Sequence, residues 1–324
     1  MHITPAWCEE QFGTQLRAFA ADLHSHPELS FEETRTTQKI LQALQSLPGV
    51  EVLATGAKTG AVARLAGGEG PAVALRADID AIPQHEAVQR PDASVYEGKM
   101  HACGHDTHTA SLLGAAMALC RRKSALRGDV YFVFQPAEEA LSGAKYLVEQ
   151  CGLFQAIPPA AMFGLHNYPE LPLGTVGVKQ GQLMSYKDVF EMRFVGRSGH
   201  SSMPQKNIDP IVAAAAFIQS VQTITSRNVG PLEAAVVSIC QVHAGTPRNL
   251  VVDDVLLSGN IRTLDEAVRA RVLQRFEQIA RGTADAYECQ LKLDMHPIVP
   301  GVNNPAGLYR IALAAAEASL GQEA

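Results

Sequence analysis

Short runs of apolar residues alternate with longer stretches of helical pattern along the first half of this 324-residue chain. Apolar runs of four to eight residues are typical of strands, whereas apolar side chains three or four positions apart are typical of helices. Strands separated by helices indicate an α/β domain, in which helices cover the faces of a sheet. We expect strands at residues 61–65, 72–77, 130–134 and 161–165, and helices at residues 7–23, 32–47, 107–120 and 142–150.

The order of the predicted elements changes after Gly181. We expect strands at residues 188–195, 234–242, 255–262 and 290–295, and helices at residues 208–226 and 265–286. This β-α-β-β-α-β order over about 110 residues is the ferredoxin-like pattern. We therefore predict a first domain made of residues 1–181 and 291–324, into which a compact second domain of residues 182–290 is inserted.

Composition excludes several classes of protein. Hydrophobic residues make up 47% and charged residues 19% of the chain, which is typical of a globular protein and not of a disordered or collagen-like one. A net charge of −6 gives no basic footprint, so we expect no nucleic-acid partner. We also expect a cytoplasmic protein with no membrane partner, because no apolar run reaches the ~18 residues of a membrane span and the N-terminus lacks a signal-peptide pattern. The six widely spaced cysteines fit reduced thiols.

The densest group of reactive side chains lies at residues 101–108, which hold one thiol, three imidazoles and one carboxylate. Cys103 and His105 are two positions apart, so in extended backbone both side chains point to one face. Thiolate and imidazole suit zinc and similar divalent metals. Asp106 could orient a ligating imidazole from behind. This cluster therefore predicts a metal site.

Two further groups follow the ends of predicted strands. Glu138 and Glu139 come directly after the strand at 130–134, and His166 follows the strand at 161–165. Active sites of open α/β sheets collect at such strand ends. One carboxylate of the pair can bind metal while the other stays free to carry protons. The alternative is a solvated acidic turn at the start of a helix.

Asp78 and Asp80 follow the strand predicted at residues 72–77. Each carboxylate could orient a metal-ligating imidazole, or could instead cap the loop. Polar groups at the ends of several strands of one sheet favour the first interpretation, because chance alone seldom collects them there.

These motifs resemble those of the hippurate-hydrolase-like metallo-amidohydrolases. This group includes N-acyl-amino-acid amidohydrolases and indoleacetyl-amino-acid hydrolases, within the aminoacylase/carboxypeptidase superfamily. The resemblance runs in order over essentially the whole chain and is most specific at residues 100–108 and 135–139. The matching stretches are residues 23–30, 75–83, 100–108, 134–139, 166, 196–204, 245–249 and 259–263.

The resemblance implies a mixed-sheet, metallopeptidase-like catalytic domain with a two-metal site, and an inserted lid domain through which subunits form a homodimer or higher homo-oligomer. Its implied reaction is hydrolysis of the amide bond of an N-acyl amino acid, such as hippurate or an acetyl-amino acid, by metal-activated water. Zinc, manganese, cobalt and nickel all suit the ligands. The implied metal ligands are Cys103, His105, Glu139 and His166, with Cys103 as the bridge.

The resemblance also implies roles for four other residues. Glu138 would act as general base and general acid. His200 would reach the active site of a neighbouring subunit and help to hold the developing oxyanion. Asn249 and Arg262 would contact the oxyanion or the free carboxylate of the substrate. The alternatives are that His200 is a polar loop residue after a strand and that Arg262 is a surface cation at the end of a strand, although for Arg262 we favour the functional role.

The family pattern continues well past the lid and ends with a histidine that completes the second metal site, whereas this sequence stops at Ala324. We therefore expect the last part of the catalytic domain to be absent and the second metal ion to be weakly held or missing. Two alternatives stay open. One is a truncated family member that keeps the fold and the dimer interface without turnover, and the other is a hydrolase with Cys103 as nucleophile and a nearby histidine as base.

Overall fold

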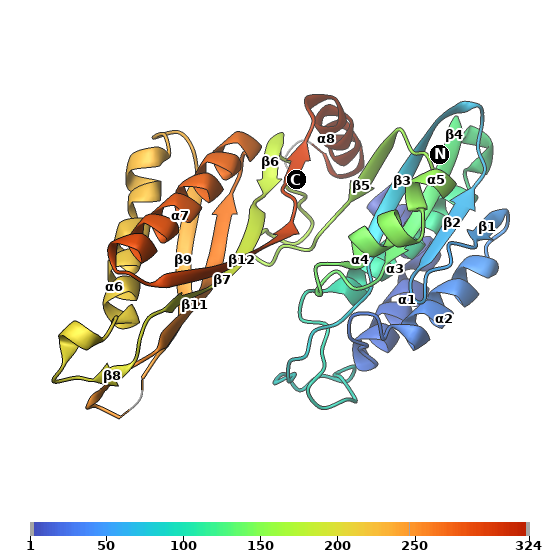
Figure 1. Cartoon of the computed structure of the whole chain (residues 1–324). Helices are drawn as coiled ribbons and strands as arrows, with labels where there is room; N and C mark the ends of the chain where they lie inside the picture. Colours follow the sequence, from blue (N-terminus) through green and yellow to red (C-terminus); the bar gives the residue numbers. More distant parts are fainter. Residues whose placement is uncertain (1–2, 246, 322–324) are drawn as a thin grey trace. The chain divides into compact units, whose positions relative to one another are not determined.

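The structure, a computed structural model, describes residues 3–245 and 247–321 (Figure 1). Thr246, within the matching stretch 245–249, lies outside the described residues. The chain divides into two compact units. Unit 1 contains Met1–Gly177 and Ile311–Ala324, and unit 2 contains Val178–Arg310. Unit 2 extends beyond the expected range 182–290 because the strands that follow residue 290 pair with other strands of unit 2.

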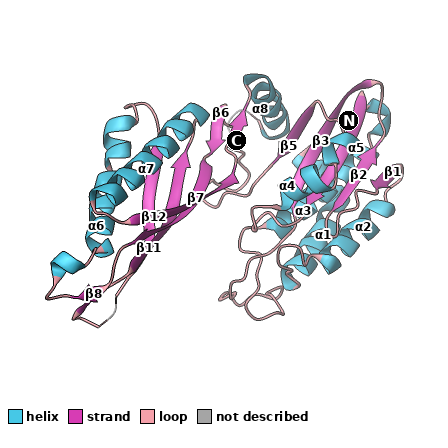
Figure 2. Ribbon diagram, viewed as in Figure 1, coloured by secondary structure: helices cyan, strands magenta, loops and turns pink. Residues whose placement is uncertain are grey.

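Unit 1 is built on a mixed five-stranded sheet with the strand order β1-β2-β4-β3-β5 (Figure 2). Its strands are β1 (Val50–Leu53), β2 (Ala61–Leu65), β3 (Gly70–Asp78), β4 (Gly128–Gln135) and β5 (Ala161–Gly164). Strand β3 runs parallel to β4 and β5, whereas β2 runs antiparallel to β1 and β4. The predicted α/β fold with a mixed sheet is confirmed.

Helical segments cover both faces of this sheet. They are α1 (Pro5–Ser25), α2 (Thr34–Gln45), α3 (His105–Cys120), α4 (Gly143–Lys145) and α5 (Leu153–Ala156), with short turns at Lys123–Ala125 and Tyr146–Gln150. Phe132 and Phe134 of β4 pack into the cluster that holds residues of α1, α2 and α3. Tyr131 and Val133 point to the opposite face and pack with Leu153. Burial on both faces explains why β4 is a continuous apolar run.

Helix α3 begins at His105, two residues before the start expected from the sequence. Gly104 is its N-cap, with a left-handed φ of 80° that a residue with a Cβ rarely adopts. A Cβ at this position would also lie 2.5 Å from the side chain of Asn167. The tight turn at Gly104 therefore places Cys103 on the loop and His105 in the first turn of the helix.

Unit 2 contains an antiparallel four-stranded sheet with the strand order β12-β7-β11-β9. Its elements follow the order β7 (Tyr186–Val195), α6 (Pro210–Val221), β9 (Ala235–His243), β11 (Asp254–Thr263), α7 (Glu266–Ala286) and β12 (Gln290–Val299), which is a β-α-β-β-α-β connection. The other elements of the chain's second half are β6 (Gly181–Met184), β8 (Gly199–His200), β10 (Leu250–Val251), β13 (Val302–Asn304), α8 (Ala306–Leu320), and the short helical segments Pro204–Lys206 and Ile224–Asn228.

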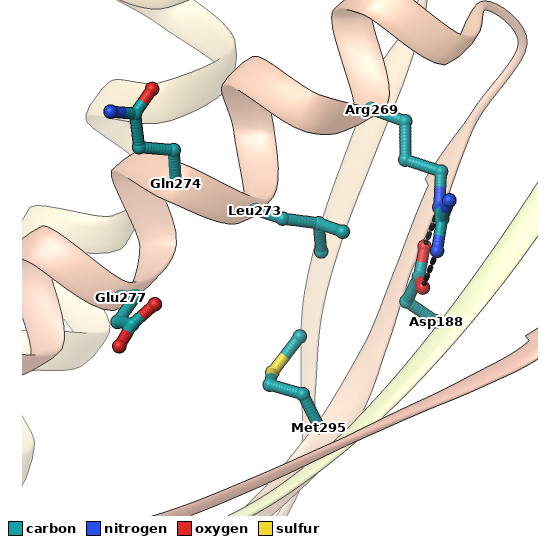
Figure 3. A pocket seen from close by; sticks show the side chains of 6 residues that line it. All are labelled: Asp188, Arg269, Leu273, Gln274, Glu277 and Met295. Atoms are coloured by element: carbon teal, nitrogen blue, oxygen red, sulfur yellow. Dashed lines mark hydrogen bonds and ion pairs between the residues drawn. The ribbon is translucent and has the colours of Figure 1, made fainter.

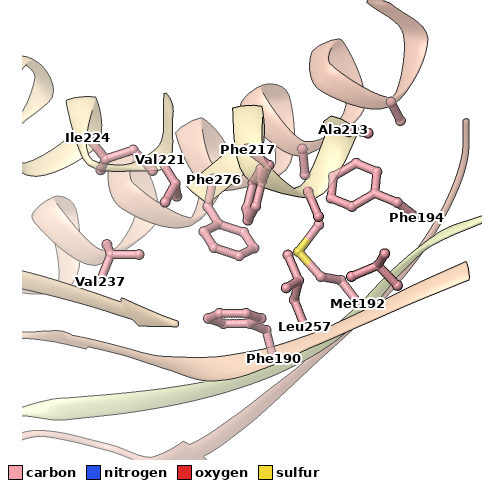
Figure 4. Packing of buried hydrophobic residues seen from close by; sticks show 14 of the residues in the cluster. Phe190, Met192, Phe194, Ala213, Phe217, Val221, Ile224, Val237, Leu257 and Phe276 are labelled. Carbon is pink, nitrogen blue, oxygen red and sulfur yellow. The ribbon is translucent and has the colours of Figure 1, made fainter. Parts of the chain in front are cut away.

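An aromatic core joins the two long helices of unit 2 to its sheet (Figure 4). The ring of Phe276 on α7 lies 4.6 Å from that of Phe190 on β7 and 5.4 Å from that of Phe217 on α6. All three side chains are fully buried. Helix α7 is capped by Asp265, which accepts hydrogen bonds from two backbone N–H groups of its first turn. None of the helices within residues 3–245 and 247–321 is long and apolar enough to cross a membrane.

Candidate metal centre

Three of the predicted metal ligands meet in unit 1. One ligand atom each from Cys103, His105 and Glu139 lies within 4.8 Å of the other two. Nε2 of His105 lies 3.8 Å from Oε1 of Glu139, and both atoms are buried with no hydrogen-bond partner among the described residues. A buried polar atom that makes no hydrogen bond destabilises the folded protein unless a ligand binds to it. A thiol, an imidazole and a carboxylate at one point therefore fit a divalent transition metal.

The fourth predicted ligand, His166, lies beside this group. A ligand atom of His166 is within 4.8 Å of ligand atoms of His105 and His108. The side chain is exposed, and its Nδ1 lies 2.7 Å from the carbonyl oxygen of Asn167. His108 is engaged at both ring nitrogens, because Nδ1 lies 2.6 Å from Asp78 and the backbone N–H of Asn167 donates to Nε2 at 2.9 Å. His166 is thus the better candidate for a ligand, and His108 holds Asn167 in place.

The carboxylate of Asp80 contacts three of the residues around the centre. Its Oδ1 lies 3.3 Å from Nδ1 of His105, an arrangement that directs Nε2 of that ring to the centre. The backbone N–H groups of Glu138 and Glu139 donate to its two oxygens at 3.0 Å each. The hydroxyl of Ser30 donates to Oδ2 at 2.7 Å. Of the two roles left open for this aspartate, the geometry supports orientation of the site residues.

Burial changes the acidity of two groups at the centre. Burial raises the pKa of Cys103 to about 12, and a hydrogen bond with Glu139 and the charge of Glu138 add to the shift. The thiol is therefore protonated at neutral pH when no cation is bound. Burial also raises the pKa of Glu138, with further contributions from Asp78 and Glu139. A carboxyl group shifted in this direction exchanges protons closer to neutral pH.

Hydrogen bonds and nearby charges together outweigh the effect of burial on the pKa at two neighbouring groups. Burial alone would lower the pKa of His105, but its hydrogen bond with Asp80 and the charge of Asp78 raise it. Burial disfavours the ionised form of Asp78, but the hydrogen bond with His108 and the charge of Arg76 lower the pKa of this carboxyl group. The carboxylates of Asp78 and Asp80 therefore lie close to His105 in their negatively charged form. Their charge favours a cation bound to the ligand atoms.

Asp106 does not orient either predicted ligand imidazole. Its Oδ2 lies 2.8 Å from Nδ1 of His24, and Nε2 of His24 lies 3.1 Å from Glu86. The reason is geometric, since consecutive residues of a helix point about 100° apart and Asp106 directly follows His105. His101 is also buried, with neither ring nitrogen hydrogen-bonded to the described residues, and burial lowers its pKa to about 4.

The remaining predicted site residues lie in unit 2, at two separate places. His200 and Asn249 are neighbours, because the N–H of Ser201 donates to the carbonyl oxygen of Asn249 at 3.1 Å. His200 lies on β8, which follows β7, and Asn249 directly precedes β10, which leads into β11. Both residues are therefore close in the chain to the place where Asp254, the first residue of β11, pairs with Val195, the last residue of β7. Arg262 is exposed near the other end of β11. At about 3.3 Å per residue, positions 254 and 262 are roughly 26 Å apart.

A model described as peptidase family M20/M25/M40 matches residues 74–324. This chain belongs to that family. The predicted kinship with N-acyl-amino-acid amidohydrolases is confirmed by curated M20 relatives. The N-acetylcysteine deacetylase of Bacillus subtilis (strain 168) is 43% identical, over 97% of this chain and 82% of that protein. The N-acyl-L-amino acid amidohydrolase of Geobacillus stearothermophilus is 38% identical, over 90% and 79%.

Solved structures agree with the M20 assignment. The Bacillus subtilis YXEP protein, described as a dinuclear metal binding peptidase from the M20 family, aligns with a TM-score of 0.84 and 40% identity, over 96% of this chain and 80% of that one. A putative aminohydrolase from methicillin-resistant Staphylococcus aureus aligns with a TM-score of 0.92 and 30% identity, over 97% and 84%. The predicted enzyme class, a metal-dependent amidohydrolase or peptidase, is confirmed by these relatives.

Two open surface pockets of about 280 Å³ each lie at different places relative to the predicted metal ligands. One is lined by Glu139 itself. Its other lining residues are Leu29, Ser30, Glu32, Ala81, Pro83 and Ala140. The other pocket lies in unit 2 (Figure 3), where Arg269 forms two hydrogen bonds with Asp188 at 2.7 and 2.8 Å beside the side chains of Leu273 and Met295. The charge of Arg269 is therefore already paired, whereas the first pocket borders the predicted metal ligand Glu139.

Proposed function

We propose that the chain is a metal-dependent hydrolase of N-acyl amino acids, with Cys103, His105, Glu139 and His166 as metal ligands. The observation that carries this proposal is a pair of buried atoms that make no hydrogen bond to the described residues, Nε2 of His105 and Oε1 of Glu139, beside the thiol of Cys103. The names of two relatives, an N-acetylcysteine deacetylase and an N-acyl-L-amino acid amidohydrolase, support the substrate class.

In this proposal Glu138 moves the proton. A divalent cation at the centre would polarise the substrate carbonyl and make water more acidic. Glu138 adjoins the ligands, is half-buried and has a raised pKa, so it is suited to take a proton from water and give it to the leaving nitrogen. The second transfer matters because the scissile amide nitrogen, without this proton, would have to leave as a strongly basic anion.

The alternative with Cys103 as nucleophile is disfavoured. A thiol attacks as its thiolate, and catalytic cysteines have a lowered pKa. The pKa of Cys103 is instead raised to about 12 by burial and by nearby carboxylates. A cation is the partner that would convert this buried thiol into a thiolate.

This acidity leads to a pH prediction for Zn²⁺ binding. The thiol of Cys103 must lose its proton to bind the ion, so binding at pH 7 should release a proton and affinity should rise with pH by about tenfold per unit from this group alone. Isothermal titration in two buffers with different ionisation enthalpies measures the released proton, with Cys120→Ser as a control at a cysteine outside the cluster. Equal Zn²⁺ affinity at pH 6 and pH 8 would rule out a thiolate ligand.

We further propose that unit 2 is the lid and dimerisation domain. His200 and Arg262 lie too far apart for one copy of unit 2 to place both around one small substrate. Two subunits that each contribute one of these residues would meet that requirement. We therefore expect sedimentation velocity at micromolar concentration to show a homodimer, whereas a strict monomer would contradict this role of unit 2.

The proposed activity is tested by amine release from a panel of N-acetyl and N-benzoyl amino acids. We expect turnover by protein loaded with Zn²⁺ or Mn²⁺, loss of turnover after treatment with a chelator, and recovery when the ion is returned. A protein that binds metal fully but hydrolyses no member of the panel would favour the alternative of an inactive family member. Chelator-resistant turnover would contradict the metal mechanism.

A further inference from the structure

Glu33 is a fully buried carboxylate outside the set of proposed ligands and proton carriers. It stands at the start of α2, where Oε2 accepts a hydrogen bond from the hydroxyl of Thr59 at 2.8 Å. Oε1 accepts a hydrogen bond from the backbone N–H of Ala137 at 2.7 Å. Because Ala137 directly precedes Glu138, this second bond connects α2 to the loop that carries both site glutamates.

Ala137 has a backbone conformation that alanine disfavours. Its φ is +50°, in the left-handed region where a Cβ is strained. Such strain persists only where the surroundings impose it. On the other side of the residue, the N–H of Gly143 donates to the carbonyl oxygen of Ala137 at 3.0 Å. Ala137 is fully buried, so its N–H has no access to water if the bond to Glu33 is lost.

Two buried carboxylates hold three successive backbone N–H groups of this loop. Glu33 accepts from Ala137, and Asp80 accepts from Glu138 and Glu139. The two aspartate bonds fix the peptide groups before the site glutamates, and the Glu33 bond fixes the one before Ala137. If Ala137 relaxed to a negative φ, the chain would rotate at the residue that immediately precedes Glu138.

We propose that Glu33 is a positioning residue that holds Ala137 in its left-handed conformation and thereby directs Glu138 and Glu139 to the metal centre. The roles of those two glutamates rest on the proposed function. The contacts of Glu33 require an acceptor for the Ala137 N–H and a polar partner for Thr59. A glutamine can supply both, since its oxygen accepts from the N–H and its amide can donate to the hydroxyl.

The test titrates Zn²⁺ alone into the full chain and its variants. Glu33→Ala should weaken Zn²⁺ binding about 10- to 100-fold, the usual effect of losing a group that orients a ligand, and should lower kcat with little change in KM. Glu33→Gln should remain within about threefold of wild type. The matched control is Glu28→Ala, because the carboxylate of Glu28 likewise accepts two hydrogen bonds, here from the backbone N–H groups of Arg35 and Thr36 at the start of α2, but none from Ala137.

A second substitution separates positioning from general stabilisation of the fold. Glycine adopts a positive φ without strain, so adding Ala137→Gly to Glu33→Ala should recover about tenfold in Zn²⁺ affinity. Thermal unfolding of all variants shows whether they are destabilised to the same extent. Equal loss of Zn²⁺ affinity in Glu33→Ala and Glu28→Ala, or no recovery with glycine, would overturn the positioning role.

Failure of the proposed function would be recognised separately. If the wild-type protein does not bind Zn²⁺, the metal proposal is wrong, and a crystal structure of metal-free Glu33→Ala still decides the role of Glu33. A negative φ at position 137 in that variant would support the inference. An unchanged left-handed Ala137 would overturn it.

Discussion

Glu138→Gln should abolish almost all turnover of an N-acyl amino acid while metal binding stays normal. Glutamine keeps the shape of the side chain but cannot accept a proton, so it can neither activate water nor protonate the leaving amine. Loss of general acid–base catalysis typically lowers rates by about 10²- to 10⁴-fold, and a residue that performs both transfers should reach the upper end. The measurements are kcat from amine release and metal content by mass spectrometry.

Glu139→Gln is the matched comparison. It makes the same chemical change at the adjacent position, but there it weakens a metal ligand, so occupancy should fall together with rate. Loss of metal in Glu138→Gln with retention in Glu139→Gln would mean that the two roles are reversed. Near-normal turnover in Glu138→Gln would show that Glu138 is not the general base.

Asp80→Asn should weaken Zn²⁺ binding by about 10- to 100-fold, because this carboxylate orients both His105 and the backbone of the two glutamates. An asparagine oxygen can replace one oxygen of Asp80, but its amide group cannot accept the remaining N–H bond. The loss should appear in a competition titration with a chromophoric chelator, and turnover should fall with it.

Asp129→Asn provides the control for Asp80. Asp129 lies on β4 of the same sheet, where it accepts a backbone N–H bond from Gly67 at 2.9 Å and pairs with Arg64. It has no contact with the ligand group, so its substitution should leave Zn²⁺ affinity unchanged. An unchanged affinity in Asp80→Asn as well would show that the carboxylate does not orient the ligands.

Local patterns in the sequence were sufficient to predict most elements of the fold. The run at residues 61–65 coincides with β2, and the apolar run at residues 130–134 lies within β4. These strands are recognisable because neighbouring structure buries both of their faces. Strand β1 was not predicted, since it has only four residues and these are half-buried or exposed, which gives too weak an apolar signal.

The cluster of Cys103 and His105 was predictable because its members are only two positions apart in the sequence. The contacts that hold the site were not, since they join distant parts of the chain. Glu33 and Ala137 are 104 positions apart, and His24 and Asp106 are 82 positions apart. A sequence motif shows which residue types are present, but only the fold shows which carboxylate faces which N–H group.

Anomalous diffraction from crystals of the wild-type protein grown with Zn²⁺ tests the central claim most directly. Data collected above and below the zinc absorption edge locate the ion without reference to activity. We predict a peak within bonding distance of Sγ of Cys103, Nε2 of His105 and a carboxylate oxygen of Glu139. Zinc bound elsewhere, with no peak at these three atoms, would contradict the account.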